Sequence, residues 1–202
     1  MINDAQERMS RFFRKRVLQL SSIRSMWHDE RVQCYNDKDL PPSDILQDVG
    51  SIFLAGPTSR HQLIEYNWRS SAVYLLRKAD FQGFIFVPEP RGEEIAGDFT
   101  ERDFIHRWES SRLLSSSRVL FWIPRKEDEL LGLNTNLELG IFIGRALLSR
   151  NSSSVFIGWP DGAERMGLPE HYAIELAGFE RYKTLEELCL AVAGKKRLQT
   201  SS

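Results

Sequence analysis

From residue 51 onward the sequence alternates between short apolar runs and longer amphipathic segments. The apolar runs predict strands at SIFLAG (51–56), GFIFVPE (83–89), RVLFWIP (118–124) and SVFIGW (154–159), with a short strand at FERYK (179–183). Helices are predicted over residues 65–79, 100–114 and 135–148, and over TLEELCLAVAG near the C-terminus. Because the strands are apolar throughout, with no polar residue at every second position, each should be buried on both faces of a parallel sheet.

This pattern predicts an α/β protein with a flavodoxin/Rossmann-like three-layer sandwich of about five parallel strands. Residues 1–32 look helical and contain the basic cluster RFFRKR (11–16), whereas 36–48 look like a linker because a Pro-Pro pair blocks helix formation. We therefore predict three parts: a helical N-terminal extension and linker (1–48), an α/β domain (49–195) and a flexible tail (196–202).

Composition excludes several classes of function. The formal net charge of -1 argues against a general nucleic-acid binder. No apolar run approaches the roughly 20 residues that span a bilayer, and the N-terminus lacks the pattern of a signal peptide, so a cytoplasmic protein without membrane contact is predicted. The two cysteines, Cys34 and Cys189, lie far apart without a metal-ligand pattern, which predicts packing thiols and no metal site.

The loop after the first predicted strand is short of side-chain bulk. Ala55, Gly56 and Pro57 end that strand where, in flavodoxin-like sheets, ligands bind beside the carboxyl ends of the strands. A bulky side chain would fill this space, so the loop is a candidate ligand contact. The alternative is an ordinary tight turn between a strand and a helix.

Glu138 is the first candidate for catalysis. Thr135 precedes it by three residues, which is the spacing of a capping box, so Glu138 should lie in the first turn of a helix. The helix dipole would then keep its carboxylate ionised near neutral pH. The alternative is that Glu138 only closes the cap. Gly140 and Gly144 follow, and either close packing on the sheet or a helix contact across a dimer explains them.

Glu109 is the second candidate, in the preceding helix beside Trp108. A local explanation competes with a catalytic role. Glu109 with Arg112, and Asp103 with Arg107, have the spacing of ion pairs on a helix surface.

In this order and spacing, five segments resemble the nucleoside 2-deoxyribosyltransferase-like superfamily. They are IFLAGP, NWR (67–69), the Trp108–Glu109 pair, VLFWIP and N-x-ELG (136–140). The resemblance covers roughly residues 50–190, about two thirds of the chain, and leaves the first 48 residues outside. It implies a nucleoside or nucleotide substrate whose N-glycosidic bond is cleaved without metal or cofactor, and it implies a homodimer.

The resemblance also implies roles for particular residues. Glu138 would be the nucleophile on the anomeric carbon, and Glu109 would bind or protonate the leaving base, with Asp98 and Asp103 as substitutes. Arg69 would help bind the substrate, unless it is a structural partner within the NWR helix. The implied substrate-binding positions are Ala55, Gly56, Pro57, Ser59, Arg69, Asp98, Asp103, Asn134, Thr135 and Asn136.

One departure from the family weakens the prediction of efficient transfer. Family members have a tyrosine in the first strand that orients the nucleophile, whereas this strand has Phe53 and no tyrosine. That hydrogen bond is missing here or comes from elsewhere. The alternative function is therefore a nucleotide-binding sensor or interaction module with the same fold and no turnover.

Overall fold

The computed structural model describes residues 29–35, 37, 39–58, 68–89, 102–126, 132–149 and 153–195. Within these ranges the strands form one parallel sheet, which confirms the predicted α/β class. The strands are β1 (Val32–Gln33), β2 (Ser51–Ala55), β3 (Phe84–Phe86), β4 (Arg118–Trp122), β5 (Val155–Gly158) and β6 (Arg181–Tyr182).

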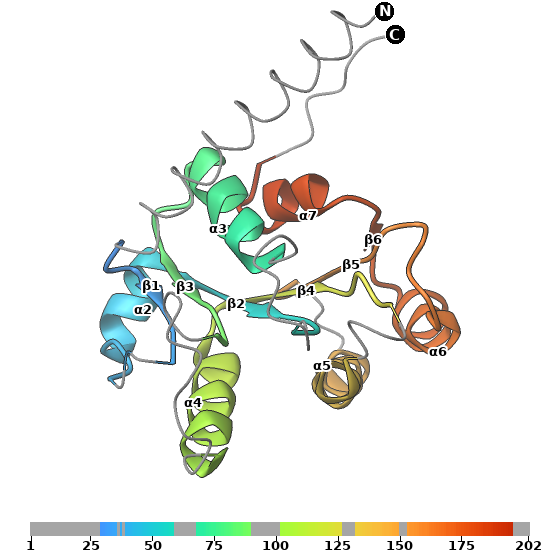
Figure 1. The fold of residues 1–202 in the computed structure, drawn as a ribbon, viewed down its shortest axis with the longest axis horizontal. Helices are drawn as coiled ribbons and strands as arrows, with labels where there is room; N and C mark the ends of the chain where they lie inside the picture. The colour runs from blue at the N-terminus through green and yellow to red at the C-terminus, as the bar shows by residue number, and fades with distance from the viewer. Residues whose placement is uncertain are drawn as a thin grey trace, which may run out of the picture.

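Helices cover both faces of this sheet and make a three-layer sandwich (Figure 1). On one face lie α3 (Trp68–Lys78) and α7 (Leu185–Val192). On the other lie α2 (Ser43–Val49), α4 (Arg102–Ser115) and α5 (Leu133–Ser149). The short α6 (Gly167–Pro169) continues into a π-helical segment, η3 (Glu170–Leu176), beside α5.

Strand β2 shows why the apolar runs are unbroken. Phe53 and Ala55 pack into the core under α4 and α5, whereas Ile52 and Leu54 pack into the core under α3 and α7. All four side chains are at most 1% exposed. Successive residues of a strand point to opposite faces, so a strand with two covered faces carries apolar side chains at consecutive positions.

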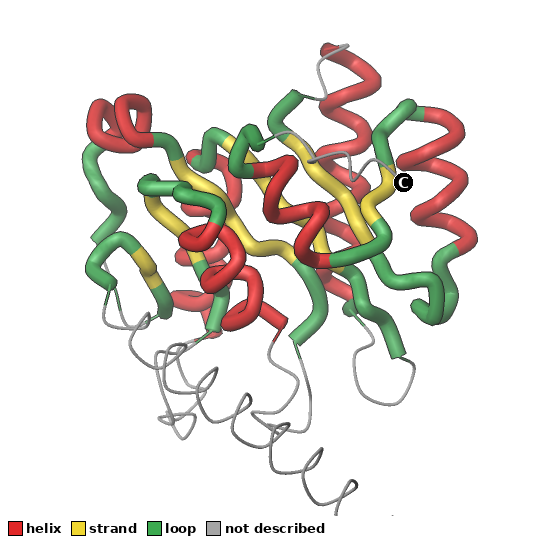
Figure 2. The backbone as a smooth tube through the Cα atoms, turned by 90° about the horizontal axis from the view of Figure 1, so that it is seen from above, coloured by secondary structure: helices red, strands yellow, loops and turns green. Residues whose placement is uncertain are grey.

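The strand order is β1-β3-β2-β4-β5-β6, and Figure 2 shows the strands side by side with helices on either side. Without β1, this is the flavodoxin-like order, in which the chain first builds outward from β2 to β3 and then returns to β4. The order therefore reverses between β2 and β4. Ligands of such sheets bind at this reversal, beside the carboxyl ends of the strands.

Two predictions about the first 48 residues are wrong. Val32, expected in a helix, begins strand β1, which pairs with β3 in the sheet although it precedes the predicted domain start at Val49. Residues 43–48, expected in a linker, lie in α2. Pro42 blocks helix before α2 but sits at its N-cap, and a proline at the start of a helix costs nothing because the first amide hydrogens have no partner within the helix. Residues 1–28 of the predicted N-terminal extension and the whole predicted tail, 196–202, lie outside the described residues.

The predictions about the start of α5 also need correction. The helix begins at Leu133, and the carbonyl of Gly132 accepts from the amide of Asn136 at 3.3 Å. Thr135 therefore lies inside the first turn and Glu138 in the second, so they form no capping box. Gly140 and Gly144 do not pack closely on the sheet either, because a Cβ atom added to either would meet nothing within 4 Å.

Candidate functional site

The Gly56–Pro57 loop lies against the neighbouring strand. A Cβ atom on Gly56, whose φ is +154°, would lie 2.2 Å from the carbonyl oxygen of Trp122 and 2.7 Å from the ring of Trp68. Gly56 is therefore required by the close approach of β2 to β4, which is a different reason from the space for a ligand that the sequence suggested. Pro57 in turn lies beside Gly132, where an added Cβ would be 3.1 Å from the Pro57 Cβ. The loop at the end of β2 thus packs against the residue that precedes α5.

Arg69 of α3 holds this loop from beneath. Its side chain is 2% exposed and donates to the carbonyls of Leu54 at 3.1 Å and Gly56 at 2.5 Å, and to the Thr58 hydroxyl at 3.1 Å. It also forms an ion pair with Glu89, at 2.6 Å, where the chain leaves β3. Arg69 thus has the structural role that the sequence left open, and it brings a buried positive charge under the carboxyl ends of β2 and β3.

Glu109 lies half-buried in the middle of α4 and accepts a hydrogen bond from the hydroxyl of Tyr35. Tyr35 follows β1, and burial together with the negative charge of Glu109 raises the pKa of its hydroxyl above the usual range. The hydroxyl therefore stays protonated and acts as the donor. The ion pair expected between Glu109 and Arg112 does not form, because Arg112 stacks on Trp108 and donates to the carbonyl of Asp37.

Glu138 is half-buried in the second turn of α5. Burial and, to a smaller extent, the negative charge of Glu109 raise the pKa of its carboxyl to about 7, against the opposing effect of the positive charge of Arg69. The expectation that the helix dipole keeps Glu138 fully ionised near neutral pH is therefore wrong. The dipole acts mainly on the first turn, and Glu138 lies beyond it. The charges of Glu109 and Arg69 thus both act on the carboxyl of Glu138.

The raised pKa of Glu138 makes the free energy of unfolding depend on pH. In the unfolded chain the carboxyl ionises near 4.5, and in the folded protein near 7. Stability is therefore lost as pH rises through this interval, because ionisation then costs more in the folded state. Glu138→Gln removes this cost. The free energy of unfolding of the variant, relative to that of the wild type, should therefore rise by about 2 kcal/mol between pH 5.5 and pH 8. Urea unfolding at both pH values measures this difference.

The matched control for this prediction is Asp48→Asn. Asp48 is an exposed carboxylate on α2, so its replacement should change stability equally at the two pH values. A Glu138→Gln variant with the same pH dependence as the wild type would show that Glu138 is not buried beside a second negative charge.

The polar residues at the start of α5 face different surroundings. Thr135 is 2% exposed, whereas Asn134 and Asn136 are exposed. Arg125, which follows β4, donates to the Asn136 side-chain oxygen at 2.5 Å and to the carbonyl of Arg165 at 3.1 Å. Arg125 thus fixes the side chain of Asn136. Asn134 is exposed, and its side chain has no hydrogen bond to another described residue.

Of the remaining predicted residues, the structure describes Asp103, which is not brought into this site. Asp103 is exposed in the first turn of α4, and Arg107 donates to its backbone carbonyl at 3.1 Å instead of pairing with its carboxylate. Ser59 and Asp98 lie outside the described residues, as do residues 59–67, 90–101 and 127–131, into which the chain continues from the ends of β2, β3 and β4.

Two residues of the site, Tyr35 and Glu89, were missed in the sequence. Glu89 had a usable signal, because it ends the apolar run GFIFVPE and the carboxyl ends of parallel strands share one edge of the sheet. Tyr35 had none, since the strand that precedes it is two residues long and no periodicity can be read from it.

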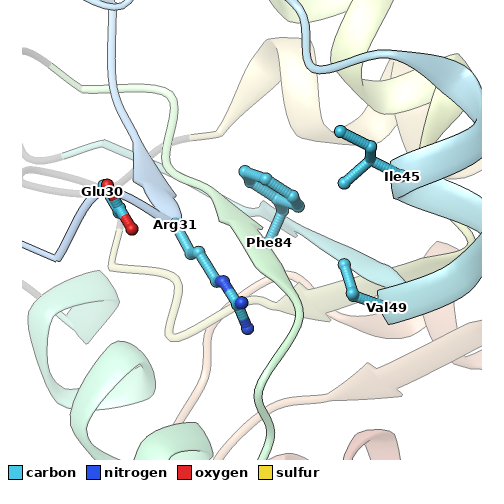
Figure 3. A pocket seen from close by; sticks show the side chains of 5 residues that line it. All are labelled: Glu30, Arg31, Ile45, Val49 and Phe84. Atoms are coloured by element: carbon cyan, nitrogen blue, oxygen red, sulfur yellow. The ribbon is translucent and has the colours of Figure 1, made fainter.

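Two hollows open elsewhere on the described surface. One, of about 270 Å³, lies between α2 and the edge of the sheet and is lined by Glu30, Arg31, Ile45, Val49 and Phe84 (Figure 3). The other, of about 280 Å³, lies between α4 and α5 near the amino ends of β4 and β5, beside Val119 and Val155. Neither includes Glu109 or Glu138. Both hollows lie at the amino ends of the strands, whereas proteins of this fold class bind ligands at the carboxyl ends.

The site has the groups for acid–base chemistry on a small molecule. It joins two carboxylates, a tyrosine hydroxyl and a buried arginine–glutamate pair at the carboxyl edge of the sheet. Among the residues that the structure describes, no cluster of histidine, cysteine or carboxylate side chains has the arrangement of a metal site. Both Cys34 and Cys189 are buried, as expected of packing thiols.

Comparison with models of known protein families finds no match to the chain, and comparison with curated proteins finds none. Within the described ranges, no helix is both long and apolar enough to cross a membrane.

Proposed function

We propose that this protein cleaves the N-glycosidic bond of a nucleoside or nucleotide, by hydrolysis or by transfer to another base, with Glu138 as the nucleophile and Glu109 as its partner. Three observations support the proposal: Glu109 is hydrogen-bonded to Tyr35 in the turn after β1, Arg69 is buried under the carboxyl end of β2, and the charges of both Glu109 and Arg69 act on the pKa of Glu138. Most enzymes that cleave glycosidic bonds use such a pair of carboxyl groups.

The reaction needs one proton on the pair. In the reactive form this proton lies on Glu109 and Glu138 is ionised, so the proton must leave Glu138, whose pKa is raised to about 7, before the substrate is attacked. An oxygen of Glu138 bonds to the anomeric carbon, the electrons of the carbon–nitrogen bond pass to the base, and Glu109 gives the base its proton. Water then attacks the anomeric carbon, loses a proton to Glu109 and releases the sugar from Glu138. A second base in place of water gives transfer.

Incubation with a panel of nucleosides, nucleoside monophosphates and NAD tests the proposal, with free base measured by chromatography. We expect base release from at least one compound and none above background with Glu138→Ala. The proposal is overturned by no release from any compound, or by wild-type release in the variant.

An alternative is a nucleotide-binding sensor or interaction module without turnover. The pKa of about 7 for Glu138 favours it, because near neutral pH much of the protein holds its nucleophile protonated. A sensor would raise its melting temperature in the presence of one compound of the panel and leave that compound unchanged. Measurable turnover of the same compound would exclude this alternative.

We further propose that the protein forms a homodimer through α5. One face of this helix exposes Leu133, Leu137, Ile141 and Leu148, by 66%, 70%, 49% and 90%, with open space over the two glycines between them. An uncharged apolar face is complementary to a copy of itself, and glycines four residues apart let two helices approach closely.

Leu137→Glu should therefore convert the dimer to a monomer, because two carboxylates would be buried near the symmetry axis. Sedimentation equilibrium measures the change. Leu168→Glu is the matched control, since Leu168 is 71% exposed on α6 and should leave the dimer intact. A wild-type protein that is monomeric at 100 times the assay concentration would contradict the proposed dimer.

A further inference from the structure

The turn after β1 is attached to α4 by several contacts. Within the turn, the amide of Cys34 donates to the Asp37 carboxylate at 2.8 Å, and the amide of Asp37 donates to the carbonyl of Cys34 at 2.9 Å. The carbonyl of Asp37 then accepts from the Trp108 indole at 2.9 Å and from Arg112 at 3.1 Å. The turn is thereby fixed against the two residues that flank Glu109 on the same helix surface.

Tyr35 lies in this turn and makes three different contacts. Its amide donates to the carbonyl of Glu89 at 3.1 Å, and its ring packs edge-on against Trp108, with ring centres 5.2 Å apart. Its hydroxyl donates to Oε1 of Glu109. The backbone and the ring therefore hold Tyr35 in place without its hydroxyl, whose partner within the described ranges is the carboxylate of Glu109.

The hydrogen bond occupies one oxygen of Glu109 and leaves the other for the substrate. Oε2 has no hydrogen-bond partner among the described residues, and the side chain is half-buried, so it is not fully withdrawn from solvent. A glutamate in mid-helix has three rotatable side-chain bonds, and a donor on one oxygen restricts them. After Glu109 gives up its proton, the same donor stabilises the carboxylate that remains.

We infer that Tyr35 is a positioning residue of the proposed reaction: its hydroxyl holds the Glu109 carboxyl in the orientation that serves the leaving base. The inference rests on the proposed function. It assigns part of the active site to the chain before residue 49, because the turn after β1 supplies a tyrosine to the carboxylate pair, whereas β2 has Phe53 and no tyrosine. The carboxylate that this tyrosine contacts is Glu109, and the nucleophile Glu138 is not its partner.

The test is the kinetics of Tyr35→Phe on the compound of the panel that the wild type cleaves best. We expect kcat to fall about 10- to 100-fold, which is the range for loss of a hydrogen bond to a charged group, with KM changed less than threefold. The melting temperature should change little, because the backbone and ring contacts of Tyr35 remain. Each variant is assayed at least about 15 °C below its own melting temperature, so that lost stability is not measured as lost rate.

Tyr182→Phe is the matched control. The Tyr182 hydroxyl also donates to a glutamate, Glu180 at 3.0 Å, but it does so at β6, on the far side of β5 from the site. Its removal should leave kcat unchanged. Equal losses of kcat in the two variants would overturn the inference.

A double mutant separates positioning from a general structural effect. If Tyr35 acts through Glu109, then Tyr35→Phe should cause less than a twofold further loss in a Glu109→Gln background. A full 10- to 100-fold loss there would contradict the inference, as would wild-type kcat in the single variant. If Glu138→Gln is inactive, each of these two results would reject the role of Tyr35 and leave the proposed function intact. Wild-type base release by Glu138→Gln would instead reject the proposed function itself.

Discussion

Replacing Glu138 with glutamine is expected to lower kcat for base release by roughly a thousandfold or more, equivalent to about 4 kcal/mol of lost transition-state stabilisation. Glutamine has nearly the shape of glutamate but cannot form the bond to the anomeric carbon, nor can its neutral amide stabilise positive charge on the sugar. Single-turnover measurements of base release with excess enzyme test this directly.

The control for this variant is Glu175→Gln. Glu175 is exposed on η3 and pairs with His171 at 2.8 Å, away from the carboxyl edge of β2. It should keep wild-type kcat. A Glu138→Gln variant with more than about a tenth of wild-type kcat would rule out a nucleophilic role, since removal of a nucleophile costs several orders of magnitude.

Gly56→Ala is expected to destabilise the fold by more than about 4 kcal/mol, which for many domains of this size prevents folding at 37 °C. The new Cβ would lie 2.2 Å from the Trp122 carbonyl oxygen, which is backbone in the neighbouring strand. Relief would require β2 and β4 to separate where Ala55 pairs with Phe121. Chemical denaturation, or the yield of soluble protein where unfolding is complete, measures the effect.

Gly162→Ala provides the comparison. A Cβ atom on Gly162 would meet nothing within 4 Å, so this variant should stay within about 0.5 kcal/mol of the wild type. A folded Gly56→Ala protein of near wild-type stability would mean that the loop after β2 does not approach β4 as closely as this structure has it.

The central strands were predictable because their burial leaves a strong pattern. The runs that form β2, β3, β4 and β5 are apolar at every position that faces either core, and each segment between consecutive strands is long enough for one crossover helix. β1 and α2 were not predictable in the same way. β1 has two residues, and α2 buries only Leu46, so neither has the repeated apolar positions on which such predictions depend.

The candidate site was predictable in its carboxylates and not in their environment. Glu109 and Glu138 were predicted from a resemblance of their segments to a known superfamily, and they lie on α4 and α5, which cover the same face of the sheet. Their electrostatics depend on contacts between segments far apart in the chain: Tyr35 with Glu109 across 74 positions, and Arg69 with Glu89 across 20. Spacing within a helix predicted a low pKa for Glu138, whereas burial and a second carboxylate from another helix raise it.

The most direct test of the nucleophilic role of Glu138 is to trap the sugar on it. A 2′-deoxy-2′-fluoroarabinosyl analogue of the cleaved compound destabilises positive charge at the anomeric carbon and should slow release of the sugar from the enzyme. After incubation, mass spectrometry of the intact protein and of its peptides should show one fluorosugar per chain, attached to Glu138. A label on Glu109, or an unlabelled protein that still releases the base, would contradict the account.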